Sequence, residues 1–119
     1  MAWLPGTSAT SSVKTVTSAG TPVQLSTVHK MVYAVMFQAL PFNTNRVVIG
    51  SDNTVRAGDA SSTNPSGPVL AILGKGSATE TPASGGASVK GKFNGIDLYD
   101  LWLDSVTNDE GIVWSYIEA

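Results

Sequence analysis

The chain contains no cysteine and only one histidine, and these two shortages exclude several kinds of chemistry. Without thiols it forms no disulfide and no thiolate zinc site, and it has no cysteine nucleophile. A lone histidine cannot supply the repeated ligands of a metal cluster, so we interpret His29 as a surface or strand-end residue. At 119 residues the chain is long enough to bury a core without such cross-links.

Charge is scarce as well. Asp, Glu, Lys and Arg make up 13% of the residues, the net charge is −2, and the basic residues are scattered along the chain. Nucleic-acid binding needs a basic patch or stripe, so we expect no nucleic-acid partner. No apolar run approaches the ~20 residues of a membrane-spanning helix. The start of the chain also lacks the basic and apolar regions of a secretory signal, so we expect no membrane partner and no export.

The most apolar part of the sequence is residues 31–40, followed after 41–45 by the short apolar run 47–49. Both runs are rich in β-branched and aromatic residues and are separated by Pro and Asn, a pattern typical of two strands joined by a turn. An apolar run of this length does not by itself exclude a helix. Tyr33 and Val35 favour a strand, because such residues lose rotamer freedom in a helix. We therefore predict a central hairpin whose first strand is covered on both faces.

Shorter segments of alternating or aromatic composition, separated by Gly, Pro and Asn, predict the remaining strands. These segments are residues 13–17, 23–25, 69–73, 87–93, 101–104 and 112–117. A tight bend is expected at 96–100 and a hairpin turn at 108–111. The sequence therefore predicts an all-β fold, an antiparallel β-sandwich or barrel of about seven to eight short strands, as one domain over residues 13–119.

Three stretches do not fit this strand pattern. Residues 1–12 are small and polar apart from Trp3 and Leu4, which predicts a flexible N-terminal arm. Residues 51–68 and 74–86 are rich in Ser, Thr, Gly, Ala and Asn, and each is as long as the ~12–15 residues beyond which loops are usually disordered or functional. The aromatic tip of the arm either docks on a partner or folds back. The two long loops are either mobile or lie flat on a neighbouring subunit.

The candidate partner-binding residues come from the arm and the two long loops, because a flat contact suits small polar side chains. They are Trp3, Leu4, Asn53, Arg56, Asn64, Lys75 and Thr79. None of them is assigned a chemical step.

Five carboxylates lie close together near the C-terminus: Asp97, Asp100, Asp104, Asp109 and Glu110. Their spacing lacks the alternating ligands and closing Glu of an EF-hand loop. A pair of them has the groups for acid–base chemistry only if an apolar pocket raises one pKa. We expect Asp97 and Asp100 to cap and turn the chain through their side-chain oxygens. Phosphate-loop and G-x-S-x-G patterns are absent, so we predict no catalytic residue, no metal and no cofactor.

Three aromatic residues of the late strands, Trp102, Trp114 and Tyr116, have the chemistry of a sugar-stacking platform. Trp114 and Tyr116 are two residues apart and share one strand face with Ile112. An apolar neighbour on the same face favours a position in the core or at a subunit interface over an open platform.

Several motifs follow one another in a distinctive order. They are VTSAGTPVQLS at 16–26, a Val- and Phe-containing strand that ends in Gln38, Ala39 and Leu40, NTNRVVIG at 43–50, IDLYDLWLD at 96–104, and GIVWSY at 111–116. In this order the chain resembles a group of small β-sandwich virion proteins of tailed bacteriophages, which includes capsid decoration (cement) proteins. The resemblance covers residues 13–117, and the inserts at 51–68 and 74–86 are longer than the usual connections of that group.

The resemblance implies a structural role without chemistry. A decoration protein binds the major capsid protein and bridges capsomers, so its affinity comes from contact area, shape and multivalency. It implies a location on the capsid surface of the virion, assembly in the host cytoplasm, and a homo-oligomer, for which we expect a trimer. Two other functions remain open: a tail- or fibre-associated domain that binds a host glycan, and a small carboxylate-dependent hydrolase.

Overall fold

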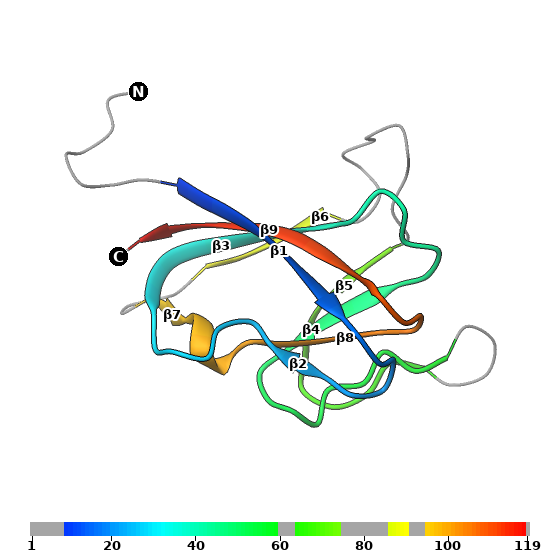
Figure 1. Ribbon diagram of the computed structural model, residues 1–119. Coiled ribbons are helices and arrows are strands. Elements are labelled where there is room, and N and C mark those ends of the chain that lie inside the picture. The colour runs from blue at the N-terminus through cyan, green and yellow to red at the C-terminus, as the bar shows by residue number, and fades with distance from the viewer. Residues whose placement is uncertain (1–8, 60–63, 75–85, 91–94, 119) are drawn as a thin grey trace.

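A computed structural model describes residues 9–59, 64–74, 86–90 and 95–118 (Figure 1). The elements in chain order are β1 (Ala9–Val16), β2 (Val23–Gln24), β3 (Met31–Ala39), β4 (Val47–Gly50), β5 (Val69–Leu73), β6 (Gly86–Lys90), β7 (Ile96–Asp97), the 3-10 helix η1 (Leu98–Asp100), β8 (Trp102–Ser105) and β9 (Glu110–Glu118). The predicted all-β class is therefore confirmed.

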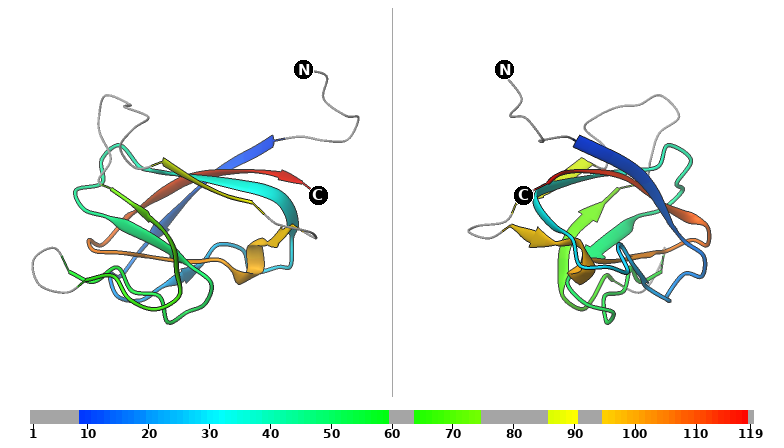
Figure 2. Two further views of the ribbon diagram at one scale, coloured as in Figure 1. Left: turned by 180° about the vertical axis from the view of Figure 1, so that it is seen from behind. Right: turned by 60° about the vertical axis from the view of Figure 1, so that its left-hand side comes forward.

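The strands form two antiparallel sheets that pack face to face. The large sheet has the order β1-β9-β3-β6, with β7 paired to the start of β3, and the small sheet has the order β2-β8-β4-β5. Figure 2 shows the two layers from behind and after a partial turn. The sheets do not close on each other, so of the two predicted architectures the sandwich is confirmed and the barrel is not.

The core lies between the sheets and is built by strand alternation. On β3, for example, Val35, Phe37 and Ala39 are buried, whereas Met36 between them is exposed. Side chains two apart share a face, so β3 and β9 of the large sheet each give one row to the core. The buried core residues are Val16, Leu25, Val32, Val35, Phe37, Ala39, Val47, Ile49, Leu73, Leu98, Leu101, Leu103, Ile112 and Trp114.

The predicted central hairpin is wrong. β3 pairs with β9, β6 and β7, whereas β4 lies in the other sheet and pairs with β5 and β8. Residues 41–45 carry the chain from one sheet to the other. The predicted hairpin at 108–111 is wrong for the same reason, since β8 and β9 also belong to different sheets. A turn signal shows that the chain reverses, but the choice of hydrogen-bonding partner depends on the packing of the whole sandwich.

The burial predicted for the two central strands is also reversed. β3 was expected to be covered on both faces, but its Tyr33 is 66% exposed. The short strand β4 is the one buried on both faces, because Val48 on its outer side packs against Val55 and Ala57 of the next segment. Composition alone does not distinguish the two cases, because both strands consist mainly of apolar residues.

Three predicted boundaries need correction. β1 begins at Ala9 and pairs with β9 along its whole length, so the N-terminal arm predicted over 1–12 is too long by residues 9–12. The loop predicted over 51–68 is not structureless in its described parts, because Arg56 and Ser66 form an antiparallel bridge and Val55 is buried. The bend expected at 96–100 is divided between β7 and η1. Residues 1–8 and 75–85 lie outside the described residues.

Candidate interaction surface

The outward row of the large sheet follows from the strand register. Inward Val35, Phe37 and Ala39 of β3 pair with Tyr116, Trp114 and Ile112 of β9, so the residues between them point away from the small sheet. The same alternation, carried over to β1, gives the remaining positions. We call the following residues the outer face: Val13, Thr15, Tyr33, Ala34, Met36, Gln38, Val113, Ser115 and Ile117.

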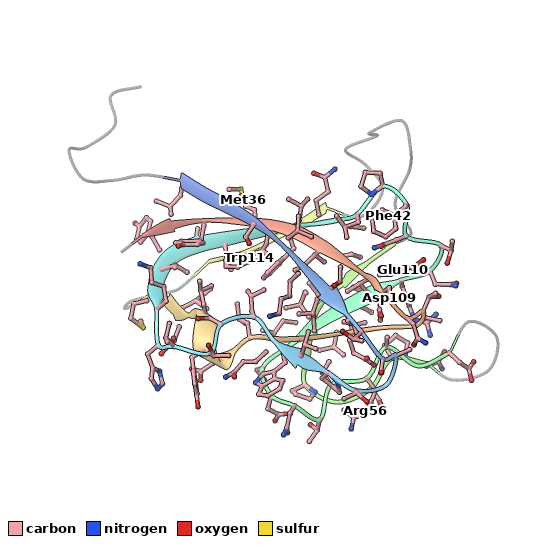
Figure 3. All side chains as sticks on the ribbon, viewed as in Figure 1. Met36, Phe42, Arg56, Asp109, Glu110 and Trp114 are labelled. Carbon is pink, nitrogen blue, oxygen red and sulfur yellow. The ribbon has the colours of Figure 1, made fainter. Side chains whose placement is uncertain are left out.

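The nine outer-face residues of β1, β3 and β9 are uncharged and six of them are apolar, whereas β6 adds Lys90 in register with Ala34. Val13 is 58% exposed, Met36 is 42% exposed, and Tyr33 is also open to solvent. None of the nine residues is an Asp, Glu, Lys or Arg. Figure 3 shows Met36 on the side of the large sheet that faces away from the small sheet. The exposed face of an antiparallel sheet is usually polar, and a contiguous apolar patch commonly marks a protein contact, so this face is the strongest candidate contact surface.

A second apolar row lies on β5. Leu70 and Ile72 point to the outer side of the small sheet and are exposed, while the inward Leu73 is fully buried. β5 pairs with β4 alone and is therefore an edge strand. An uncharged apolar edge strand invites pairing or packing with another chain.

The turn between β3 and β4 presents an aromatic side chain. Phe42 is 62% exposed, and Figure 3 shows it at the end of the molecule where the chain crosses between the sheets. The next residue, Asn43, is buried. Its side-chain amide forms two hydrogen bonds with the backbone of Gly111, as the backbone of a neighbouring strand would. Its Nδ2 donates to the Gly111 carbonyl oxygen at 2.7 Å, and the Gly111 N–H donates to Asn43 Oδ1 at 3.2 Å.

A buried carboxylate completes the anchoring of this turn. Glu110 accepts hydrogen bonds from the backbone N–H of Thr44 at 2.7 Å, from the Thr44 hydroxyl at 2.8 Å and from the backbone N–H of Asn45 at 3.3 Å. Hydrogen bonds to an ionised acceptor are about twice as strong as neutral ones. The backbone that follows Phe42 is thus anchored before any partner arrives, which lowers the backbone entropy lost on binding.

The predicted loop residues lie on another part of the surface. Asn53, Arg56 and Asn64 are exposed, and Arg56 folds the loop onto itself by donating to the carbonyl oxygens of Asn53 and Val55. Figure 3 shows Arg56 on the small-sheet side, opposite Met36. The other candidates, Trp3, Leu4, Lys75 and Thr79, lie outside the described residues.

Three of the five carboxylates serve to hold the chain. Asp104 is buried and accepts from the backbone N–H groups of Gly20 and Ala57, at 2.9 and 2.8 Å. Asp97 accepts from the N–H groups of Lys30 and Tyr99, which confirms its predicted capping role. Asp97, Asp104 and Glu110 therefore each accept hydrogen bonds from different segments of the backbone. Among the residues described, no group of three or more His, Asp or Glu side chains is placed to hold a metal ion.

His29 is exposed, as predicted. Its Nδ1 lies 2.6 Å from Asp97 Oδ2, and its ring stacks on Tyr99 with the centroids 4.1 Å apart. The hydrogen bond from His29, together with the backbone N–H of Lys30, lowers the pKa of Asp97. This pair fastens the segment before β3 to the end of β7.

The late aromatics do not form an open platform. Trp114 is 8% exposed and stacks on the half-buried Tyr116, with the ring centroids 5.4 Å apart. Trp102 packs against the cluster of Val48, Val55 and Ala57 on the other sheet. Of the two positions that the sequence left open for Trp114, the core and a subunit interface, the structure shows the core.

Sequence reasoning missed the outer face and the anchored turn. The only signal for the outer face was the length of the apolar run in β3, which we interpreted as burial on both sides. The turn is anchored by Asn43 with Gly111 and by Thr44 with Glu110, pairs 68 and 66 positions apart that no local pattern connects.

Comparisons of the chain with protein-family models, with curated proteins and with solved structures give no match. The likeness to phage virion proteins therefore rests on the motifs of the sequence. Within the described part of the chain, no helix is both long and apolar enough to cross a bilayer.

Proposed function

We propose that this protein is a non-enzymatic structural component of a bacteriophage virion, a decoration protein that binds the major capsid protein and bridges capsomers. The observation that carries the proposal is the outer face, an uncharged and partly apolar surface on a sheet of a sandwich. The order of sequence motifs gives the virion context.

The outer face has the properties of a contact surface. A β-sandwich is stiff, so its outward row loses little conformational freedom when it meets a partner. Burying an apolar surface favours association, and the part that exceeds the entropy and desolvation costs of binding appears as affinity. Standard protein interfaces cover about 800 Å² on each partner, an area that needs a face of several strands rather than a single loop.

Oligomerisation is part of the proposal. With a trimer at a local three-fold position, each weak contact is repeated, and repeated contacts raise the overall affinity without any new chemistry. The apolar row of β5, with Leu70 and Ile72, offers a second surface for contacts between copies.

Quantitative co-sedimentation with purified particles tests the proposal. The protein is expected to accompany the particles in numbers proportional to the major capsid protein. A few copies per particle, or none, would contradict a shell role. A specific signal on a glycan array, with no binding to capsids, would favour the tail- or fibre-associated alternative.

A further inference from the structure

We propose that an open groove at the β1 side of the sandwich is a binding site for an extended peptide segment that carries a carboxylate. The groove has a volume of about 440 Å³, and its lining includes Lys14, Leu25, Val28, Leu98, Trp114 and Tyr116. Ser26, Thr27 and Lys30 also line this open groove, so polar and apolar groups contribute about equally to its surface. Such a mixed lining suits a ligand that has both apolar and charged groups.

The groove exists because the two sheets differ in length at this edge. β1 has eight residues, whereas β2, on the same side of the small sheet, has two. In Figure 1 both strands lie toward the viewer. The inner side of β1 therefore extends past the strand that would cover it.

Lys14 occupies a position that normally belongs to the core. It pairs in register with Ile112, which is fully buried on the inner side of β9, so the alternation directs Lys14 inward as well. The side chain is half-buried, and the described residues give it no hydrogen bond or ion pair. A half-buried ammonium group in an open groove is accessible to an anionic group of a ligand.

Trp114 adds a second donor without an acceptor. Its Nε1 is buried and has no hydrogen-bond partner among the described residues. A buried donor left unpaired costs about 1–3 kcal/mol, and such groups are rare in folded proteins. Lys30, whose Nζ lies 5.9 Å from the centre of the Tyr116 ring, adds positive charge at the same groove. The groove thus presents the ammonium groups of Lys14 and Lys30 beside Trp114, and a ligand with a carboxylate complements this charge.

The neighbouring strands favour a peptide over a sugar. β1 and β2 are both edge strands, each paired on one side only. Edge strands present unpaired backbone N–H and C=O groups that an extended chain matches and a sugar does not. The apolar side chains of Leu25 and Val28 provide contact for the residues that alternate with the acidic one.

The inference refines the proposed function, since a groove of this kind selects the segment of the capsid protein to which the sandwich attaches. Its test is nevertheless independent of particles. If peptide binding fails while co-sedimentation persists, the groove assignment is wrong. If co-sedimentation fails while peptide binding persists, the proposed function is wrong.

The test is a titration of the ¹⁵N-labelled full chain, followed through the indole N–H resonance of Trp114. The probe is a capped peptide of alternating leucine and glutamate, and the control is the same peptide with glutamine in place of glutamate. The glutamate peptide is expected to shift the Trp114 resonance, and added salt is expected to weaken binding. The resonance is assigned with the variants Trp3→Phe and Trp102→Phe, which leave Trp114 in place.

Variants at Lys14 give the decisive comparison. Lys14→Met keeps the length of the side chain and removes the charge, and we expect it to weaken binding of the glutamate peptide about tenfold. Lys14→Arg is expected to retain most of the affinity. Arg56→Met, which removes a charge far from the groove, is expected to change little.

Equal binding of both peptides, or equal affinity of the wild type and Lys14→Met, would overturn the proposal. A shift of the Trp114 resonance by glucuronic acid, with no shift by the peptide, would overturn the peptide assignment in favour of an acidic sugar.

Discussion

The two sheets of the sandwich differ in what lies on their outer sides. On the small sheet, Val48 points outward and is buried, because Val55 and Ala57 of the following segment pack over it. On the large sheet, Met36 and Tyr33 point outward and are exposed, and no described segment lies over them. On the small sheet, the outer row of β4 is therefore buried in a second small apolar cluster, whereas the outer row of the large sheet is exposed to solvent.

This difference shows that the burial of an outer row in this fold depends on the segments that connect the strands. The segment after β4 turns back over the small sheet and is held there by the bridge between Arg56 and Ser66 and by the bond from the Ala57 N–H to Asp104. The large sheet has no such covering in the described residues. The open row is therefore available to another protein, and the covered row contributes to the stability of the chain itself.

The largest effect is expected from a charge placed in the covered row. Val55→Asp buries an unpaired carboxylate, and we expect it to lower the free energy of unfolding by about 4 kcal/mol, measured by urea denaturation. The matched control is Val13→Asp on the outer face, which is expected to change stability by about 0.5 kcal/mol or less. Similar losses at both positions would remove the distinction between the two outer rows.

Asp104 tests how the covering segment is tied to the sandwich. Asp104→Ala leaves the N–H groups of Gly20 and Ala57 without their acceptor, so we expect a loss of about 2–3 kcal/mol in the free energy of unfolding. Asp100→Ala, at an exposed aspartate, serves as the control in the same denaturation experiment. Equal urea midpoints for the two variants would show that the hydrogen bonds of Asp104 contribute little to stability.

Met36 tests the open row. Met36→Asp is expected to weaken attachment to capsids about tenfold or more, because a carboxylate would have to lose its water in the contact. Its effect on the free energy of unfolding is expected to stay near about 0.5 kcal/mol, since the side chain is partly in solvent. Attachment is measured by co-sedimentation and stability by urea denaturation. Full attachment of the variant would place the contact elsewhere.

The smallest effect is a pH dependence at Asp97. Its pKa is lowered in the folded protein, so the ionised form stabilises the fold above the unfolded pKa of about 4, and this contribution is lost as the pH falls through the lower folded value. Asp97→Asn is therefore expected to lose less stability than the wild type on acidification below about pH 4, measured by thermal unfolding at several pH values. His29→Gln is expected to bring the pKa of Asp97 closer to its ordinary value, as an NMR titration would show.

The sequence predicted the elements better than their arrangement. The alternation of apolar residues in β1 and β5 is a local signal: β5 was predicted at its observed position, and the second half of β1 was recognised while its first half was not. The partner of β3 was not predictable, because pairing with β9 joins residues far apart in the chain. The role of Glu110 was missed for the same reason, since its carboxylate contacts Thr44 across the sandwich.

Of the contact residues predicted from the sequence, those that the structure describes lie on a different surface from the outer face, and they remain a prediction. Small polar loops were expected to make the contact, so Asn53 and Arg56 were chosen. The described loop instead bonds to itself and covers β4, while the open apolar row lies on β3, where the run of apolar residues indicated full burial. Tyr33 and Val35 are two residues apart and both favour strands, but the register shift between Val32 and Ala34 leaves Tyr33 exposed and Val35 buried.

Hydroxyl-radical footprinting of the protein, free and bound to purified capsids, tests the central claim most directly. The account predicts that Tyr33 and Met36 lose reactivity on binding, whereas Arg56 on the opposite side keeps it. Unchanged reactivity of Tyr33 and Met36 in the bound protein would contradict the claim that the open row of the large sheet is the contact surface.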